Sequence, residues 1–102
     1  METYVLIRIE KSFDWCKVSD VQSFTLPQSI MEIIKQRAEI FFDCGYTVTK
    51  GSDYFMDKKL NEQKLFEDLG RTSGVRIRFW CGDGSDYRPE YYEFLIKKTT
   101  VQ

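Results

Sequence analysis

The 102-residue chain contains no histidine. This absence excludes Ser-His-Asp and Cys-His catalysis, and it excludes nearly every zinc site that mixes cysteine with histidine. Of the three cysteines, Cys44 is expected at a helix C-terminus, where the helix dipole disfavours a thiolate, and Cys81 on an inward strand face. Cys16 is expected to be accessible, but nothing is present to activate it. The sequence therefore predicts a protein that is not an enzyme and needs no cofactor.

The chain also lacks an excess of basic residues, with 15 Lys and Arg against 16 Asp and Glu. Proteins that grip phosphate backbones usually need such an excess, so the balance disfavours nucleic acid as a partner. No apolar run approaches the ~20 residues of a membrane span, and the first residues do not resemble a signal peptide. An odd cysteine count without close pairs is typical of reduced thiols. We expect a cytoplasmic protein with no membrane partner.

Aromatic residues, in contrast, are abundant at 16% of the chain. A length near the mode for single cores, with 42% hydrophobic and 30% charged residues, predicts one globular domain over residues 1–102. Many of the aromatic residues fall in phase with inward faces. Three others, Tyr4, Trp80 and Tyr91, are out of phase with the inward faces, and Phe13, Trp15, Tyr54 and Tyr87 have no assigned face. We expect these to be exposed if the domain binds a partner and covered if it does not.

Two strands are predicted at the start of the chain. Residues 3–10 alternate, and residues 18–26 alternate more loosely, so the two segments are expected to pair antiparallel. The first strand carries Val5, Ile7 and Ile9 on one face and Tyr4, Leu6 and Arg8 on the other. Because Leu6 makes the second face partly apolar, both faces are expected to contact something.

A long helix is predicted over residues 29–44. Ser29 and Glu32 have the spacing of a capping box, in which each side chain bonds the other residue's backbone N–H, and Gly45 suits the left-handed position after the helix. The stripe at helical spacing is apolar apart from Arg37, and consists of Ile30, Ile33, Ile34, Arg37, Ala38 and Phe41.

The second half of the chain reads as shorter elements. Residues 46–50 are β-prone, 54–56 could form a short strand, 57–62 are turn-like, and 65–69 suit one helical turn or a short 3₁₀ piece. Residues 75–81 alternate strictly, with Val75, Ile77, Phe79 and Cys81 inward. Residues 90–98 form a last strand, with Tyr92, Phe94 and Ile96 on one face and Tyr91, Glu93, Leu95 and Lys97 on the other.

The acidic and glycine-rich residues 82–86 predict a hairpin loop. Asp83 and Asp86 could supply oxygen ligands to calcium, but their spacing matches no EF-hand, and Asp, Gly and Ser are also what a loop requires. No metal ligands are assigned.

The order of these elements resembles the ubiquitin-like β-grasp, in which a mixed sheet wraps one amphipathic helix. Residues 25–34 (TLPQSIMEII) are similar to its strand-to-helix junction. Residues 56–60 (MDKKL), with Leu65, Leu69 and residues 75–79 (VRIRF), are similar to its turn, short helix and last strand. The resemblance implies an α+β fold with a mixed sheet wrapped on one main helix, from which this chain departs by an extra C-terminal strand. Residues 46–56 are longer than the family's third strand, and the missing terminal Gly-Gly disfavours a conjugated modifier.

The alternative fold is a ferredoxin-like α+β sandwich. It would require residues 60–69 to form a full second helix, which Asn61, Gly70 and the short apolar stripe disfavour.

The resemblance points to the outer face of the sheet as a binding surface. Arg76, Arg78 and Trp80 project together from the side opposite Val75, Ile77 and Phe79, and Arg and Trp concentrate binding energy at interfaces. Tyr54, and Tyr4, Leu6 and Arg8, join them if their strands lie alongside. The alternative to a binding surface is that a neighbouring segment covers Trp80 and that the two arginines are solvated and bind no partner.

The predicted function is a non-catalytic module that docks a protein partner, as in the N-terminal domain of a scaffold or cytoskeletal protein. One alternative is a small inhibitor protein from a phage or bacterium. The other is a domain that binds single-stranded nucleic acid, because Arg and aromatic side chains also stack on bases.

Overall fold

The computed structural model describes residues 2–12, 14–48, 54–71, 74–81 and 90–100. The elements follow one another along the chain as β1 (Glu2–Lys11), β2 (Cys16–Phe24), α1 (Pro27–Asp43), β3 (Thr47–Val48), β4 (Phe55–Met56), β5 (Lys59–Leu60), α2 (Glu62–Leu69), β6 (Val75–Trp80) and β7 (Tyr91–Thr100). The fold is therefore α+β, as the sequence predicted. Neither described helix is long and apolar enough to cross a membrane.

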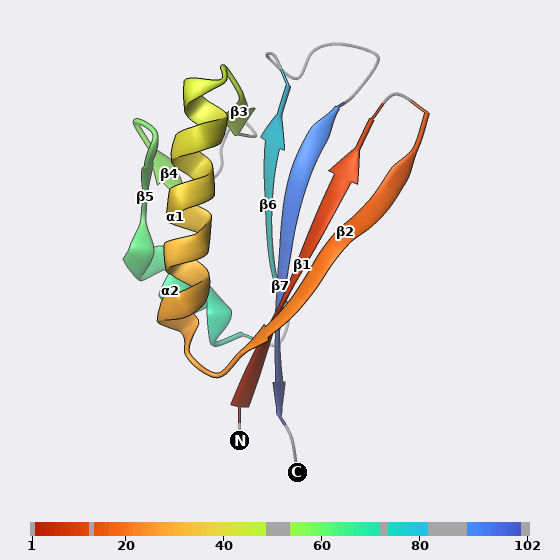
Figure 1. The fold of residues 1–102 in the computed structure, drawn as a ribbon. Coiled ribbons are helices and arrows are strands. Elements are labelled where there is room, and N and C mark those ends of the chain that lie inside the picture. The colour runs from red at the N-terminus through yellow and green to blue at the C-terminus, as the bar shows by residue number, and fades with distance from the viewer. Residues whose placement is uncertain (1, 13, 49–53, 72–73, 82–89, 101–102) are drawn as a thin grey trace.

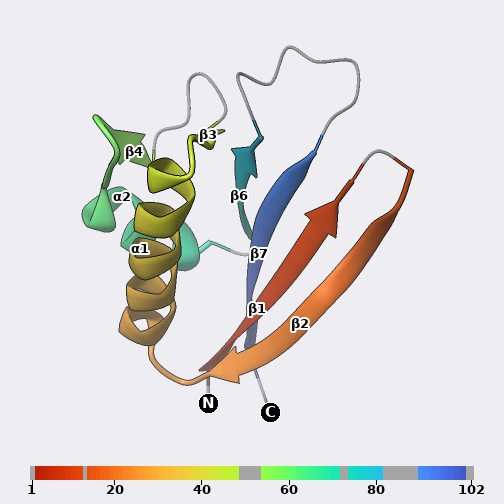
Figure 2. The same cartoon turned by 45° about the horizontal axis from the view of Figure 1, so that its top comes forward.

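A five-stranded sheet in the order β2-β1-β7-β6-β3 forms one layer, and α1 lies across one of its faces (Figures 1 and 2). All four pairings in this sheet are antiparallel, and the predicted pairing of the first two strands is confirmed. β1 and β6 run in the same direction, but β7 lies between them and is antiparallel to both. The last strand is thus inserted at the centre of the sheet.

Helix α1 begins two residues earlier than expected, and the predicted capping box is wrong. Leu26 is the N-cap residue, without a side-chain cap hydrogen bond, and Pro27 occupies the first turn, where its fixed φ suits the helix and its missing N–H costs nothing. Ser29 consequently lies inside the helix. At the other end the prediction is confirmed: Gly45 has a φ of +86°, and Tyr46 N–H donates to the Phe41 carbonyl in a Schellman motif.

The segment after α1 differs from the predicted elements. Of the strand expected over residues 46–50, Thr47–Val48 form β3, and residues 49–50 lie outside the described residues. β4 and β5 form a separate two-stranded hairpin whose turn residues, Asp57 and Lys58, both have positive φ. α2 is an eight-residue α-helix rather than a single turn, because the Asn61 side chain accepts a hydrogen bond from Lys64 N–H and caps it.

The second helix does not make the fold ferredoxin-like. That arrangement begins strand, helix, strand, whereas here two paired strands precede α1.

The core lies between the sheet and the helices. The sheet contributes Leu6 from β1, Val75, Ile77 and Phe79 from β6, and Phe94 and Ile96 from β7. Phe79 is fully buried, and its ring lies within 6 Å of four other rings, those of Phe41, Phe42, Phe55 and Phe94. Much of the aromatic content therefore fills the core, as expected.

Candidate interaction surface

Strand β6 has the two faces that its alternation predicted. Val75, Ile77 and Phe79 are buried against the helices, whereas Arg76, Arg78 and Trp80 lie on the opposite side of the sheet, here called the outer face. The register continues this face across the sheet, because residues directly opposite each other on paired strands share a face. Two rows result: Arg76–Leu95–Ile7–Val21 and Arg78–Glu93–Ile9–Val18.

Glu93 is the centre of a buried charge network on this face. Its side chain is only 4% exposed, although the strand pattern placed it on the solvent side. Its Oε1 atom accepts from Arg78 Nε at 2.5 Å and lies 3.2 Å from Arg76 Nε. A buried carboxylate must be paired, and here two neighbouring β6 residues supply the cations.

Aromatic rings complete the contacts of Arg78. Its guanidinium carbon lies 4.4 Å from the centre of the Tyr91 ring and 5.6 Å from that of Trp80, within the range of cation–π attraction. Trp80 and Tyr91 meet edge to face, with ring centres 5.0 Å apart. Arg78 is therefore held by Glu93, Tyr91 and Trp80. Arg76 is the arginine available to a partner, because its side chain is 61% exposed.

The aromatic residues are mostly covered, contrary to what a binding surface built on them would require. Tyr4 and Tyr91 are buried, Tyr54 and Trp80 are half-buried, and Trp15 is 44% exposed. Phe13 and Tyr87 lie outside the described residues. Of the arrangement predicted in β6, the placement of the three side chains on one face is confirmed, but Trp80 packs largely against its own sheet.

The other predicted site residues do not lie on the outer face. Tyr4 and Leu6 belong to the core, because the register of β1 with β7 turns their side of the strand toward α1. Arg8 shares that inner side. Tyr54 lies beside α2, where its hydroxyl donates to Asp68 Oδ2. The expectation that these four residues adjoin Arg76 and Arg78 is wrong.

The structure instead reveals an aliphatic patch, formed by Ile7, Ile9, Val18, Val21 and Leu95 on the outer face. Val18 is 58% exposed and Val21 56%, while Ile7, Ile9 and Leu95 are half-buried. On the inner side of β2, the residues opposite Arg8 and Leu6 are the polar Asp20 and Gln22. In this part of β2 the usual order of an antiparallel sheet, apolar toward the helix and polar toward water, is thus inverted, whereas Phe24 at the end of β2 lies on the inner side and packs against the core.

A sequence signal for this patch existed in the first strand. Val5, Ile7 and Ile9 form a more uniform apolar row than Tyr4, Leu6 and Arg8, and Val18 and Val21 each pair with one of that row. A bulge at Ser19 keeps both valines on one face, because Ile9 pairs with Val18 and Arg8 with Asp20.

The charges on the outer face are mainly positive. From the register, Lys11, Arg76, Arg78 and Lys97 lie on it, against Glu93 among its described residues. Because Glu93 is already paired with both arginines, the exposed charges around the aliphatic patch come from Arg76 and the lysines.

All three cysteines are free and exposed. The prediction that Cys81 points inward is wrong, because β6 ends at Trp80 and Cys81 follows the strand. Asp83 and Asp86 lie outside the described residues, and within the described part no group of potential ligands could hold a metal ion.

Among the carboxyl groups of the described residues, that of Asp68 has a pKa below its ordinary value. The hydrogen bond from Tyr54 is the main cause, and Lys64 and Arg71 add to it against the opposing effect of burial. The hydrogen bond between Tyr54 and Asp68 holds α2 beside the β4–β5 hairpin, away from the outer face.

The chain matches no protein-family model, and neither the curated proteins nor the solved structures include a significant match to it.

Proposed function

We propose that this chain is a non-catalytic, cytoplasmic interaction module that docks a protein partner on the outer face of its sheet. One observation carries the proposal: two valines of β2, Val18 and Val21, face away from α1 and are more than half exposed. In a protein without a partner, such side chains would favour the buried face. Contiguous exposed apolar surface is a feature of binding sites.

The chemistry of the surface indicates what the partner presents. The aliphatic patch calls for an apolar face, and Arg76 with Lys97 at the end of the patch nearest β6 calls for acidic residues beside it. Charge complementarity of this kind orients a partner and speeds its association. We therefore assign the partner as a protein with an apolar strip flanked by Asp or Glu.

We also propose that the fold is a variant of the ubiquitin-like β-grasp, with β7 as an added strand. The hairpin, the single long helix and the parallel directions of β1 and β6 support this relation. A domain of this kind could stand at the N-terminus of a scaffold or cytoskeletal protein or act as a small phage or bacterial inhibitor, and both roles use the same docking surface.

Binding of single-stranded nucleic acid is the less favoured function. Stacking on bases needs open aromatic faces. Here Trp80 and Tyr91 meet each other edge to face and Arg78 lies over both rings.

The test is affinity capture from a native lysate with matched variants. The outer-face variant carries Val18→Lys and Val21→Lys, and the control carries Gln28→Lys and Gln36→Lys, two exposed positions on α1. Both add two positive charges, so they separate the surface from the charge. Circular dichroism and melting temperature establish that each variant folds. The captured protein is then purified and its dissociation constant measured for all three chains.

The proposal predicts a partner whose affinity falls at least about tenfold in the outer-face variant and is unchanged in the control. Equal binding by both variants would contradict it. So would loss of binding in the control, which would mean that charge alone decides. If sedimentation instead shows that the wild type is a dimer that the outer-face variant dissociates, a second copy occupies the surface and the assignment of a different partner is wrong.

A further inference from the structure

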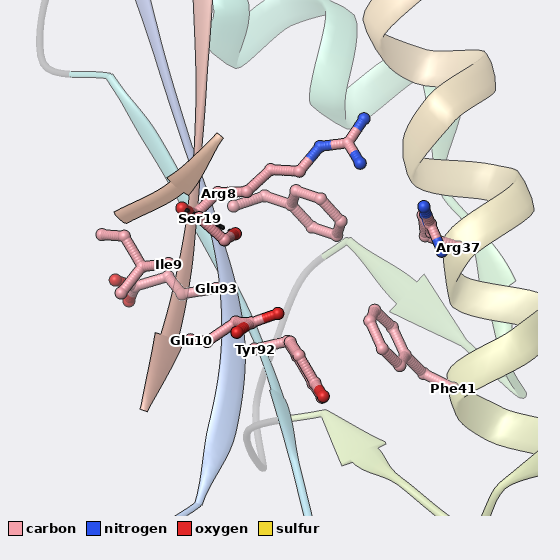
Figure 3. Close-up of a pocket in the computed structure, with 9 residues that line it drawn as sticks. Arg8, Ile9, Glu10, Ser19, Arg37, Phe41, Tyr92 and Glu93 are labelled. Atoms are coloured by element: carbon pink, nitrogen blue, oxygen red, sulfur yellow. Dashed lines mark hydrogen bonds between the residues drawn. The ribbon is translucent and has the colours of Figure 1, made fainter. Parts of the chain in front are cut away.

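A second candidate site lies on the inner face, where the β1–β2 hairpin diverges from α1. A cavity of about 240 Å³ opens between β1, β7 and the helix (Figure 3). Arg8 extends into it from β1, and Arg37 faces the same space from α1. Phe41, Tyr92 and Phe94 supply its aromatic walls. Two cations from different elements thus border one partly apolar cavity.

The guanidinium of Arg8 is only partly satisfied. One terminal nitrogen donates to Gln22 Oε1 at 3.0 Å, but Nε is buried without an acceptor. Buried N–H groups without acceptors are rare because losing water without gaining a partner is costly.

Arg37 is exposed, and no carboxylate among the described residues forms an ion pair with it. Asp20, which lies opposite Arg8 in the strand register, likewise forms no ion pair in the described structure. Both cations that border the cavity are therefore available to an anion.

The acidic residues at the cavity do not cancel this charge. Glu10 is paired with Lys17, whose Nζ lies 3.6 Å from its carboxylate. Glu93 is paired with Arg76 and Arg78 on the other side of the sheet.

The cavity walls restrict the size of a ligand. The rings of Phe41 and Tyr92 stack on each other, with centres 4.9 Å apart and planes 20° from parallel, so each holds the other in place at the edge of the cavity. The volume is below the roughly 300–1,000 Å³ of most ligand pockets, so the ligand must be small.

We propose that this cavity binds a small aromatic oxyanion, a phosphate monoester or a carboxylate. The oxyanion lies between Arg8 and Arg37, because guanidinium groups bind the oxygens of either class in pairs of hydrogen bonds. The aromatic ring of the ligand packs against Phe41 and Phe94. This site is separate from the outer face and independent of the proposed docking.

Titration of the whole chain with small probes tests the proposal, followed by NMR and calorimetry. The probes are phenyl phosphate, benzoate, inorganic phosphate and the cation benzylamine. Saturable binding of phenyl phosphate or benzoate at one site is expected, with shifts at Arg8, Phe41 and Tyr92, weaker binding of inorganic phosphate and none of benzylamine. Preference for the first or second probe identifies the ligand class.

Arg37→Gln should weaken binding of the preferred probe by about tenfold or more, since one charged hydrogen-bonding group is lost. The matched control is Arg71→Gln, an exposed arginine at the end of α2, which should leave binding unchanged. The proposal is overturned if no aromatic anion binds saturably at millimolar concentration, if benzylamine binds as well, or if the two variants weaken binding equally.

Discussion

The β6–β7 half of the sheet and the β1–β2 half use their two faces in opposite ways. In the β6–β7 half, the inner face is a packed aromatic core and the outer face holds the paired cluster of Glu93, Arg76 and Arg78. In the β1–β2 half, β1 still supplies Leu6 to the core, but β2 presents two valines outward with Asp20 and Gln22 inward, and a cavity bordered by arginines opens between β1, β7 and α1. Figure 2 shows the β1–β2 hairpin diverging from α1.

The difference shows that one sheet can divide its roles by strand. Antiparallel pairing supports β2 through its hydrogen bonds with β1, so Phe24 is the β2 side chain that packs against the core and most of the others need not. Stability is then concentrated in β6, β7 and the inner residues of β1, such as Leu6. Surfaces for binding remain on the outer face of the β1–β2 hairpin, where substitutions should affect partners more than folding.

The largest expected contrast is between a core residue and a patch residue. Phe79→Ala should cost about 3–5 kcal/mol of unfolding free energy, because the ring is fully buried among four others. Val21→Ala should cost less than about 1 kcal/mol, since the side chain is more than half exposed. Urea unfolding of both variants measures this. Similar losses would contradict the division between the two halves.

The second contrast concerns the outer face itself. Glu93→Gln should destabilise by about 2 kcal/mol, less than for a fully buried pair because Arg76 is largely exposed. Lys17→Gln removes the partner of Glu10 in the hairpin half, and this exposed pair should contribute at most about 0.5 kcal/mol. Chemical unfolding at low and high salt checks both values. A loss near zero for Glu93→Gln would mean that its two ion pairs are dispensable.

The contribution of the Tyr54–Asp68 hydrogen bond to the unfolding free energy is expected to depend on pH. The lowered pKa of Asp68 means that its ionised form is stabilised by folding, so this contribution is present at neutral pH and is lost as the pH falls below about 4, through the folded pKa. Tyr54→Phe removes the main cause of the shift and should cost about 1.5 kcal/mol at neutral pH. The difference from wild type should shrink in acid, as measured by unfolding from pH 7 to pH 2. A constant difference would indicate lost packing instead.

The smallest contrast separates the two helix starts. Asn61→Ala should cost about 1 kcal/mol because it removes the cap of α2. Ser29→Ala should change stability by no more than about 0.5 kcal/mol, because Ser29 lies inside α1 and does not cap it. Thermal melts of both variants decide the matter. A larger loss of stability for Ser29→Ala would indicate that Ser29 caps α1, as the capping box predicts.

Local patterns predicted much of the fold. The strict alternation of β6 and the apolar stripe of α1 each had one plausible buried face, and the burial of Val75, Ile77 and Phe79 in β6 and of Ile30, Ile34 and Ala38 in α1 is as predicted, whereas Cys81 and Arg37 are exposed. The first strand had two plausible buried faces. Tyr4 and Leu6 compete with Val5, Ile7 and Ile9, and only the pairing of β1 with β7 decides which row meets the helix. That choice depends on contacts far apart in the sequence.

The candidate sites were less predictable for the same reason. The strand pattern put Glu93 on the outer face, but nothing near it in the sequence indicates that it is buried there. Its burial depends on Arg76 and Arg78, which alternate along another strand and both pair with it. The β4–β5 hairpin was missed because Asp57 and Lys58 adopt positive φ without glycine. The arginine cavity needs Arg8 and Arg37, which are brought together by the packing of a strand against a helix.

The outward placement of Val18 and Val21 on β2 is the central claim, and methyl NMR with a soluble paramagnetic probe tests it most directly. The probe broadens signals of methyl groups that water can reach. The methyl groups of Val18 and Val21 should be strongly broadened, while those of Leu6 and Ile34, which are fully buried, should be protected. Protection of the two valines to the level of Leu6 would show that β2 turns its apolar side to the core, and would contradict the account.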